Sequence, residues 1–216
     1  MSEESRMAEL LCTRLCHDLT GPIGAVSNGA EFLSEEGFNM QSQAVELIIS
    51  SAFSAVTRLQ FYRMAYGSVK DGGEANLAEK QKLASDFFSV GNVTLDWPDS
   101  NADGSSVSIS IKMARTILNL LIVGTSVLMR GGSLSVRISQ DDTGAKRVSV
   151  VAKGTHIKWD AEIAQALEGH LKPEALTPKN VQLQLTYQQI KELRARFVHK
   201  VSDAEVVLEV VQDVQP

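Results

Sequence analysis

The sequence contains two cysteines and five prolines, has fewer basic than acidic side chains, and lacks a long hydrophobic run. Cys12 and Cys16 lie four residues apart in a segment with helical spacing, a separation that rarely suits a disulfide, so we expect free thiols and a cytoplasmic location. The 21 lysines and arginines against 26 aspartates and glutamates give a net charge of −5 without a basic cluster, so nucleic acid is not an expected partner. The longest uncharged apolar stretch, residues 116–129, is too short to cross a bilayer, and the acidic first residues do not resemble a signal peptide, so no membrane partner is expected.

Hydrophobic residues make up 44% of the chain and charged residues 22%, a composition typical of a folded globular protein. Over residues 3–67 the apolar positions recur at steps of three and four, which predicts helices. In the first run they are Leu11, Leu15, Leu19, Ile23, Val26, Ala30 and Leu33, and in the second Val45, Ile48, Ile49, Ala52, Val56, Leu59 and Tyr62. Residues 34–39, with a glycine after two acidic residues, indicate a helix stop and a turn. We therefore expect a helical hairpin over residues 1–68.

A two-helix hairpin cannot bury both of its apolar stripes in water, because each helix supplies the other with only one neighbour. A second copy of the chain, related by a two-fold axis, would complete a four-helix bundle, and we favour this homodimer. The alternative is that the C-terminal half of the chain covers the hairpin.

The rest of the chain mixes helical and strand patterns after a polar linker with a Gly-Gly pair at residues 69–76. Helices are expected at residues 77–88, 114–129, 160–167 and 178–196, and strands at residues 93–97, 107–111, 134–138, 148–152, 197–201 and 205–211. The turn-forming segment 141–146 predicts a hairpin between two of these strands. The expected second domain, residues 76–216, is therefore an α/β sandwich with helices on one face of a mixed sheet, which makes the whole chain α+β.

Among the four histidines, His17 stands out by its position on the first expected helix. It lies two residues from both Leu15 and Leu19, a rotation of about 200°, so its side chain should point away from the apolar stripe. The small residues on its own face are Thr20, Gly21 and Gly24. Each glycine inside a helix costs about 1 kcal/mol relative to alanine, so this face suggests close approach of another protein to the imidazole, with Pro22 bending the helix just beyond it. The alternative is a solvent-facing histidine without a role.

Residues 17–22, HDLTGP, resemble the H-box of two-component histidine kinases, in which the phosphoacceptor histidine precedes an acid, a leucine, two variable positions and a proline. The longer string at residues 11–33, LCTRLCHDLTGPIGAVSNGAEFL, resembles more specifically the ChpT-type histidine phosphotransferases of alphaproteobacteria. This resemblance implies a dimeric helical hairpin that bears a phosphohistidine, followed by a Bergerat-like α/β sandwich shaped like a kinase ATPase domain. The motif-level match is confined to this string, whereas the layout covers the whole chain.

The resemblance also implies roles for individual residues. His17 would be the phosphoacceptor, and Asp18 would hold the imidazole tautomer so that the attacking nitrogen is free. The residues expected to meet a partner are Arg14, Thr20, Gly21, Pro22, Gly24 and Asn28. A solvated surface residue remains the alternative for both Asp18 and Arg14. Kinases that also dephosphorylate their partners usually carry an amide or hydroxyl where Gly21 stands, which argues against phosphatase activity.

The second half departs from the motifs with which kinases bind ATP. A stretch that resembles the kinase N-box contains Asn119, but Val123, four residues later, replaces the magnesium-binding asparagine. A stretch that resembles Asp-x-Gly-x-Gly has Ala152 in place of the adenine-recognising aspartate and His156 in place of the last glycine. Residues 180–190, where kinases carry a glycine-rich turn, contain no glycine. We therefore expect no cofactor of the chain's own, with magnesium supplied by the partner receiver domain.

The sequence thus predicts a histidine phosphotransferase that relays phosphoryl groups through His17 between receiver-domain aspartates, without binding ATP. By resemblance, the donor is the receiver domain of a hybrid histidine kinase, and the acceptors are response regulators such as a CtrA-like transcription factor. Two alternatives stay open: an ATP-dependent histidine kinase core, and a scaffold that binds regulators without phosphotransfer. A metal site at Cys12, Cys16 and His17 is disfavoured, because a fourth ligand is missing and His17 should point about 100° away from Cys16.

Overall fold

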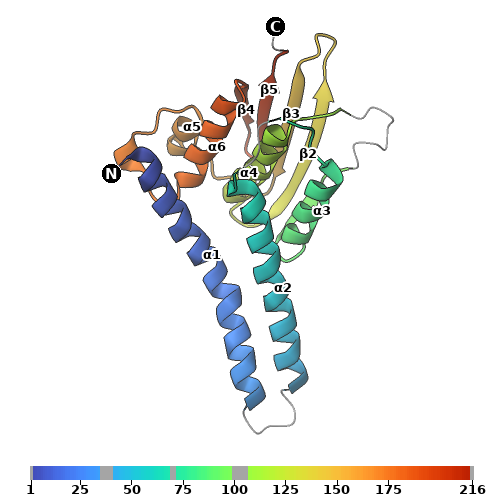
Figure 1. The fold of residues 1–216 in the computed structure, drawn as a ribbon, viewed down its shortest axis with the longest axis vertical. Helices are drawn as coiled ribbons and strands as arrows, with labels where there is room; N and C mark the ends of the chain where they lie inside the picture. The colour runs from blue at the N-terminus through green and yellow to red at the C-terminus, as the bar shows by residue number, and fades with distance from the viewer. Residues whose placement is uncertain (1, 35–40, 69–71, 99–106, 215–216) are drawn as a thin grey trace.

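A computed structural model describes residues 2–34, 41–68, 72–98 and 107–214 of the chain. Its helices are α1 (Glu3–Ser34), α2 (Gln41–Tyr66), α3 (Leu77–Phe88), α4 (Ile111–Val127), α5 (Ala161–Leu167), the short 3-10 helix η1 (Pro173–Ala175) and α6 (Val181–Glu192). Its strands are β1 (Val93–Asp96), β2 (Gly132–Gln140), β3 (Lys146–Lys153), β4 (Arg196–Val201) and β5 (Glu205–Gln212). The two long helices form an arm that extends from an α/β body (Figure 1).

The arm is the expected helical hairpin. α1 runs through Pro22 without ending, and it packs along α2. The two helices lie close together at Gly29, where an added Cβ would be 2.7 Å from Cγ1 of Ile48 and 3.2 Å from the carbonyl oxygen of Ala44. A glycine therefore allows the close approach of the two helices at this level. The turn expected at residues 34–39 lies, apart from its first residue, outside the described residues.

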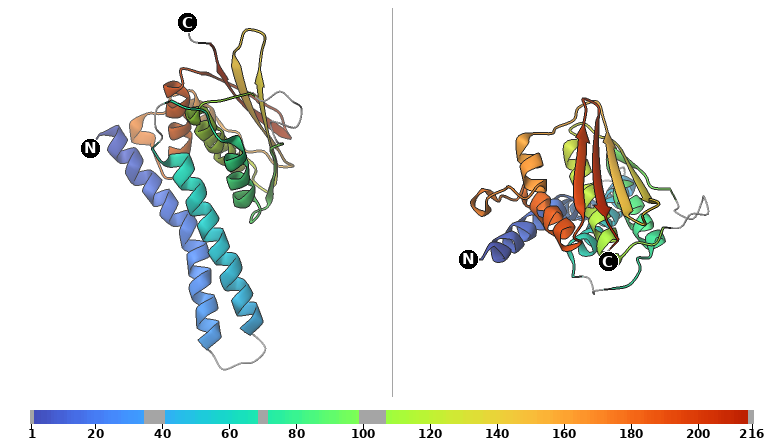
Figure 2. Two further views of the ribbon diagram at one scale, coloured as in Figure 1. Left: turned by 45° about the vertical axis from the view of Figure 1, so that its right-hand side comes forward. Right: turned by 90° about the horizontal axis from the view of Figure 1, so that it is seen from above.

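The body is built on a five-stranded sheet with the order β1-β2-β3-β5-β4. β1 pairs with β2 in parallel, and the other neighbouring strands are antiparallel. Between β2 and β3, the Asp141 carboxylate accepts hydrogen bonds from the backbone N–H groups of Thr143 and Ala145, which form the expected turn. The helices lie on one face of the sheet, as the two views of Figure 2 show. The expected mixed sheet and the α+β class are therefore confirmed.

The strand expected at residues 107–111 is wrong. Ile109 is buried, as the alternating pattern requires, but α4 already begins at Ile111, and the Ser110 hydroxyl caps it by accepting a backbone hydrogen bond at 3.1 Å. In place of a strand ladder, Ser110 makes an isolated bridge with Glu74. Alternation over a few residues indicates an extended segment with one buried side, but it does not encode a pairing partner.

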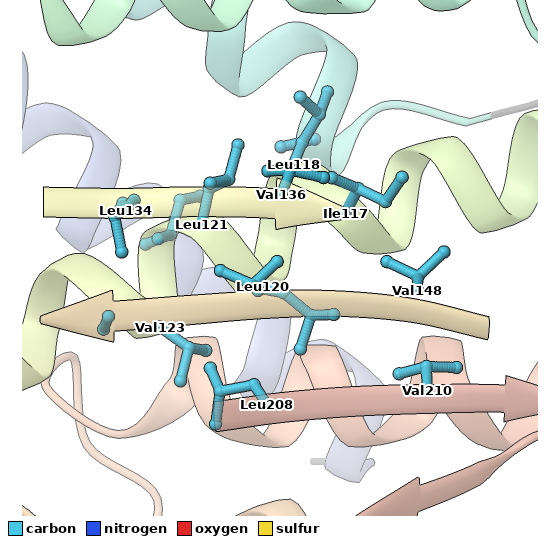
Figure 3. Packing of buried hydrophobic residues seen from close by; sticks show 14 of the residues in the cluster. Ile117, Leu118, Leu120, Leu121, Val123, Leu134, Val136, Val148, Leu208 and Val210 are labelled. Carbon is cyan, nitrogen blue, oxygen red and sulfur yellow. The ribbon is translucent and has the colours of Figure 1, made fainter. Parts of the chain in front are cut away.

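The core of the body lies between α4 and the sheet. α4 is buried along most of its length, and Figure 3 shows its side chains against those of β2, β3 and β5. The residues labelled there include Leu120, Val123, Leu134, Val148 and Leu208. Each such side chain contributes about 1.5–3 kcal/mol when it is fully buried, so this layer is the main source of the body's stability.

The same core continues into the base of the arm. Phe61 and Ala65 of α2 are 0% exposed, and Phe61 stacks on Phe87 of α3 with ring centroids 4.2 Å apart. Farther from the body α2 presents apolar side chains to solvent, since Ile49 is 64% exposed and Val56 52%. One end of α2 is thus part of the body, and the other is uncovered in the single chain. Within the described ranges, no helix combines the length and apolarity needed to cross a membrane.

Candidate functional site

His17 lies on the exposed side of α1, as its position relative to the apolar stripe predicts. Its imidazole is 87% exposed, and Nδ1 lies 3.3 Å from Oδ1 of the neighbouring Asp18. Two adjacent helical residues normally diverge by about 100°, so this contact requires Asp18 to turn toward the histidine. The arrangement leaves a solvent-accessible imidazole with an acid beside one of its nitrogens.

Asp18 is held from the opposite helix of the hairpin. Its carboxylate is 23% exposed, and Oδ2 accepts a hydrogen bond of 2.7 Å from the hydroxyl of Tyr62 on α2. The guanidinium Nε of Arg14 lies 3.9 Å from the same oxygen, which is too long for a hydrogen bond. Asp18 therefore bridges α2 and His17 and is not the fully solvated acid considered as the alternative.

Tyr62, which bonds to Asp18, stacks on a second tyrosine, Tyr66. Tyr62 and Tyr66 lie nearly parallel, at 14°, with ring centroids 5.2 Å apart. Burial, together with the hydrogen bond to Asp18, raises the pKa of Tyr62 well above its usual value, and burial likewise raises the pKa of Tyr66. Both phenols therefore stay protonated and act as donors at neutral pH. The sequence pattern assigned Tyr62 to the apolar stripe and missed its hydroxyl, although a buried tyrosine usually has a polar partner.

Arg14 points along α1 toward the body. Its Nη1 donates to the carbonyl oxygen of Lys179 at 3.3 Å, and its side chain is 20% exposed. The next residue of that segment, Asn180, donates through Nδ2 to a carboxylate oxygen of Glu162 at 2.6 Å. Residues 179 and 180, at the start of the segment that contains no glycine, are therefore bonded to α1 and to α5, respectively.

The small-residue face predicted beside His17 is open in the structure. An added Cβ at Gly21 or Gly24 would have no neighbouring atom within 4 Å outside the helix itself. Thr20 is exposed, and its hydroxyl donates to the carbonyl oxygen of Cys16 at 2.7 Å. This hydrogen bond holds the short side chain against the helix backbone. Asn28, four residues or about one helical turn beyond Gly24, is exposed as well. The face is thus shaped to admit a surface close to the helix backbone.

A buried chain of polar side chains joins α2 to α4 and α6. The Tyr66 hydroxyl donates to Oε1 of Gln182 at 2.7 Å, and Nε2 of Gln182 donates to Oδ1 of Asn119 at 2.8 Å. Nδ2 of Asn119 donates in turn to the carbonyl oxygen of Ala65 at 2.8 Å. Asn119 is 0% exposed. The residue that resembles part of the kinase N-box therefore connects the body to the base of the hairpin.

The other positions that resemble nucleotide-binding motifs are not gathered into a polar site. Val123 and Ala152 are fully buried in the apolar core, and His156 is exposed. Cys12 and Cys16 are free and exposed, as expected. In the part of the chain that the structure describes, no three His, Cys, Asp or Glu side chains converge on a possible metal position.

The sequence matches one protein family and is similar to a protein of known name. Residues 77–205 match the family model described as the histidine phosphotransferase C-terminal domain. The protein phosphotransferase ChpT of Brucella abortus is 32% identical over 177 residues, which cover 82% of this chain and 81% of that protein.

Two solved structures are similar to the fold as a whole. A bacterial phosphotransferase solved at 1.7 Å matches with a TM-score of 0.78 and 30% identity, over 94% of this chain and 95% of its own. The histidine kinase domain of a blue-light activated kinase from Erythrobacter litoralis matches with a TM-score of 0.50 and 14% identity, over 89% of this chain and 95% of its own, which shows a common fold alone. Since the family model spans more than half of the sequence and the Brucella relative most of it, this chain belongs to the histidine phosphotransferase family.

Proposed function

We propose that His17 is the phosphoacceptor of a phosphorelay, taking a phosphoryl group from an aspartate of one receiver domain and passing it to an aspartate of another. The observation that carries this proposal is the 87% exposed imidazole whose Nδ1 faces Asp18 at 3.3 Å. A hydrogen bond from Nδ1–H to the carboxylate fixes the tautomer and leaves the lone pair on Nε2. Membership of the histidine phosphotransferase family supports the same reaction.

In the proposed reaction, the lone pair of Nε2 forms the bond to phosphorus while the bond between phosphorus and the aspartyl oxygen breaks. The aspartate carboxylate leaves with that electron pair, and the transfer to the second receiver is the reverse. The phosphorylated ring carries a positive charge, which the Asp18 carboxylate beside Nδ1 balances. Phosphoryl transfer depends mainly on positioning and charge neutralisation, so magnesium held by the receiver would suffice and this chain would need no cofactor of its own.

The partners in this proposal are the receiver domain of a hybrid histidine kinase, as donor, and CtrA-like response regulators, as acceptors, all in the cytoplasm. They would approach the face of α1 where Gly21 and Gly24 leave open space beside the helix. The contact surface would consist of Thr20, Gly21, Pro22, Gly24 and Asn28, with Arg14 at its rim. Close approach matters here because a receiver aspartate lies within its own domain and must come within bonding distance of the ring.

We further propose that the chain is a homodimer through the arm. The exposed large apolar side chains of α1 and α2 are here called the arm stripe: Ile23, Phe32, Leu33, Val45, Ile49, Phe53, Val56 and Leu59. The C-terminal half, the alternative cover, packs on the base of α2 and leaves the arm stripe uncovered. A two-fold related copy would bury these residues in a four-helix bundle.

The alternative of an ATP-dependent kinase is disfavoured because the residues at the kinase-like positions are buried or already hydrogen-bonded within the protein. Both polar atoms of the Asn119 amide are used inside the protein, and Val123 offers no ligand atom and is fully buried. A bound nucleotide would need polar groups at a surface, so these residues do not fit ATP and magnesium. In our proposal residues 1–68 carry the transfer site, and residues 76–216 bind no nucleotide and form a wall beside the docked receiver.

The test is transfer of labelled phosphate from a phosphorylated hybrid-kinase receiver to the purified chain. Wild type and His17→Ala are compared, with His156→Ala as the matched control because it removes another exposed histidine. Label on wild type and on the control, but not on His17→Ala, is the expected result. Label on His17→Ala would overturn the proposal, direct labelling by ATP would favour the kinase, and regulator binding without any label would favour the scaffold.

A further inference from the structure

The contact between His17 and Asp18 is not one that a helix provides by itself. Side chains at adjacent positions leave the helix about 100° apart and do not face each other. Oδ1 of Asp18 nevertheless lies 3.3 Å from Nδ1 of His17, while Oδ2 accepts a 2.7 Å hydrogen bond from Tyr62. The shorter of these two contacts comes from α2, so the carboxylate is oriented across the hairpin.

We propose that Tyr62 is a positioning residue of the phosphotransfer site: its hydroxyl holds the Asp18 carboxylate so that Oδ1 receives the Nδ1–H of His17 and Nε2 keeps its lone pair. This inference rests on the proposed function of His17 as phosphoacceptor. Tyr62 does not touch the reacting atoms and acts through Asp18 alone.

The phenol is suited to this task because it has little freedom. Tyr62 is 5% exposed, stacks on Tyr66, and meets Phe61 and Phe87 at the edges of their rings. Phe61 is fully buried at the base of the arm, so the hydroxyl is anchored to the core of the body. Arg14 also faces Asp18, with its Nε 3.9 Å away and its Nη1 bonded to a backbone carbonyl.

Tyr66 supplies a matched control. It belongs to the same stack and is partly buried, but its hydroxyl donates to Gln182 in the body and lies near Arg14, without a hydrogen bond to Asp18. Tyr62→Phe and Tyr66→Phe therefore remove the same atom from two adjacent rings, and each takes the donor from one acceptor, a partly exposed carboxylate for Tyr62 and a buried amide for Tyr66. A merely structural role predicts similar consequences for the two variants.

The experiment measures the rate of His17 phosphorylation from a phosphorylated receiver, the 15N NMR signature of the His17 tautomer, and the unfolding free energy of each variant. For Tyr62→Phe we expect transfer to slow about tenfold, the lower end of the range seen when a metal-bound histidine loses an outer hydrogen-bond partner. The Nδ1-protonated fraction of His17 should fall as well. Tyr66→Phe should keep the rate and the tautomer of wild type despite a comparable loss of stability.

Equal rates and unchanged tautomers in the two variants would overturn the inference. If wild type accepts no phosphoryl group, the proposed function fails, and the tautomer spectrum of Tyr62→Phe still decides the positioning role. A double-mutant cycle adds a second reading: in an Asp18→Asn background, Tyr62→Phe should slow transfer little further, because the pair acts as one unit. Independent, additive effects would place Tyr62 outside the site.

Discussion

The two ends of the helical hairpin differ in how far a single chain completes them. At the base, Phe61 and Ala65 are 0% exposed, and the Ala65 carbonyl receives a hydrogen bond from Asn119 of the body. At the far end, Ile49 is 64% exposed and Phe53 47%. Residues of the body therefore cover the base, whereas the far end presents apolar side chains to solvent among the described residues.

His17 lies on α1 near the base, since the adjacent Asp18 bonds to Tyr62 of α2. Asp18, which it contacts, is anchored through Tyr62 to the finished base, and the open positions Gly21 and Gly24 lead toward the uncovered end. In our proposal the two parts of the hairpin have different roles: the base orients the side chain of His17, and the remainder of the arm contacts other proteins. The following substitutions test these two roles.

The largest effect is expected at the buried amide of the base. Asn119→Ala removes the 2.8 Å hydrogen bonds to the Ala65 carbonyl and from the Gln182 amide, which then keep only their 3.3 Å partners Gln189 and Thr186. Each lost hydrogen bond costs about 0.5–1.5 kcal/mol and the deleted side chain leaves a cavity, so the variant should lose about 3 kcal/mol of unfolding free energy. Urea unfolding of the purified protein measures this. Asn28→Ala, which alters an exposed asparagine of the arm, is the stability control. Equal stability of the two variants would mean that the base is not held by this hydrogen bond.

A charge in the arm stripe should act on association. Ile49→Glu would place two buried carboxylates in the proposed bundle, weakening the dimer by about 2–3 kcal/mol while changing the stability of the isolated chain by no more than about 0.5 kcal/mol. Sedimentation velocity over a concentration series is the measurement. Met129→Glu is the control, because Met129 lies on the body and is as exposed as Ile49, 61% against 64%. A monomeric wild type, or a dimer unaffected by Ile49→Glu, would remove the arm stripe as the interface.

Two glycines of α1 should respond to alanine in opposite directions. Gly29→Ala introduces a Cβ 2.7 Å from Cγ1 of Ile48, so it should push the helices apart and cost about 1–2 kcal/mol of unfolding free energy. Thermal and urea unfolding of this variant measure the loss. A neutral result would show that α1 and α2 can separate at this level without cost.

The smallest effect has the opposite sign. At Gly21 an added Cβ meets nothing within 4 Å, so Gly21→Ala should gain up to about 1 kcal/mol from the better helix propensity of alanine. The same variant should slow phosphoryl transfer from a receiver, because the methyl group raises the surface that a partner must approach. Greater stability together with unchanged transfer would show that the open face is not the docking surface.

The fold was largely predictable because its signals are local. Apolar residues at steps of three and four predicted the two long helices. The position of His17, two residues from Leu15 and Leu19, predicted an exposed side chain, and the imidazole is 87% exposed. The segment at residues 107–111 misled for the same reason: its alternation reports burial on one side, and the Ser110 hydroxyl that caps α4 turns the chain into a helix.

The parts of the site that could not be predicted depend on pairs far apart in the sequence. Nothing near Asp18 indicates that its carboxylate bonds to Tyr62, and nothing near Asn119 indicates that its amide reaches Ala65. From the sequence, Tyr62 reads as a member of the apolar stripe and Asn119 as a member of a nucleotide motif. Their hydrogen-bond partners are set by how α2 packs on α1 and α4, which a one-dimensional pattern does not contain.

The most direct test of the central claim is to locate the phosphoryl group on the protein itself. The wild-type chain would be mixed with a phosphorylated receiver, quenched within seconds under alkaline conditions that preserve phosphohistidine, and mapped by peptide mass spectrometry. The account predicts phosphate on His17, which disappears when an unphosphorylated acceptor receiver is added before the quench. Phosphate on any other residue, or on His17 only when ATP replaces the phosphorylated receiver, would contradict it.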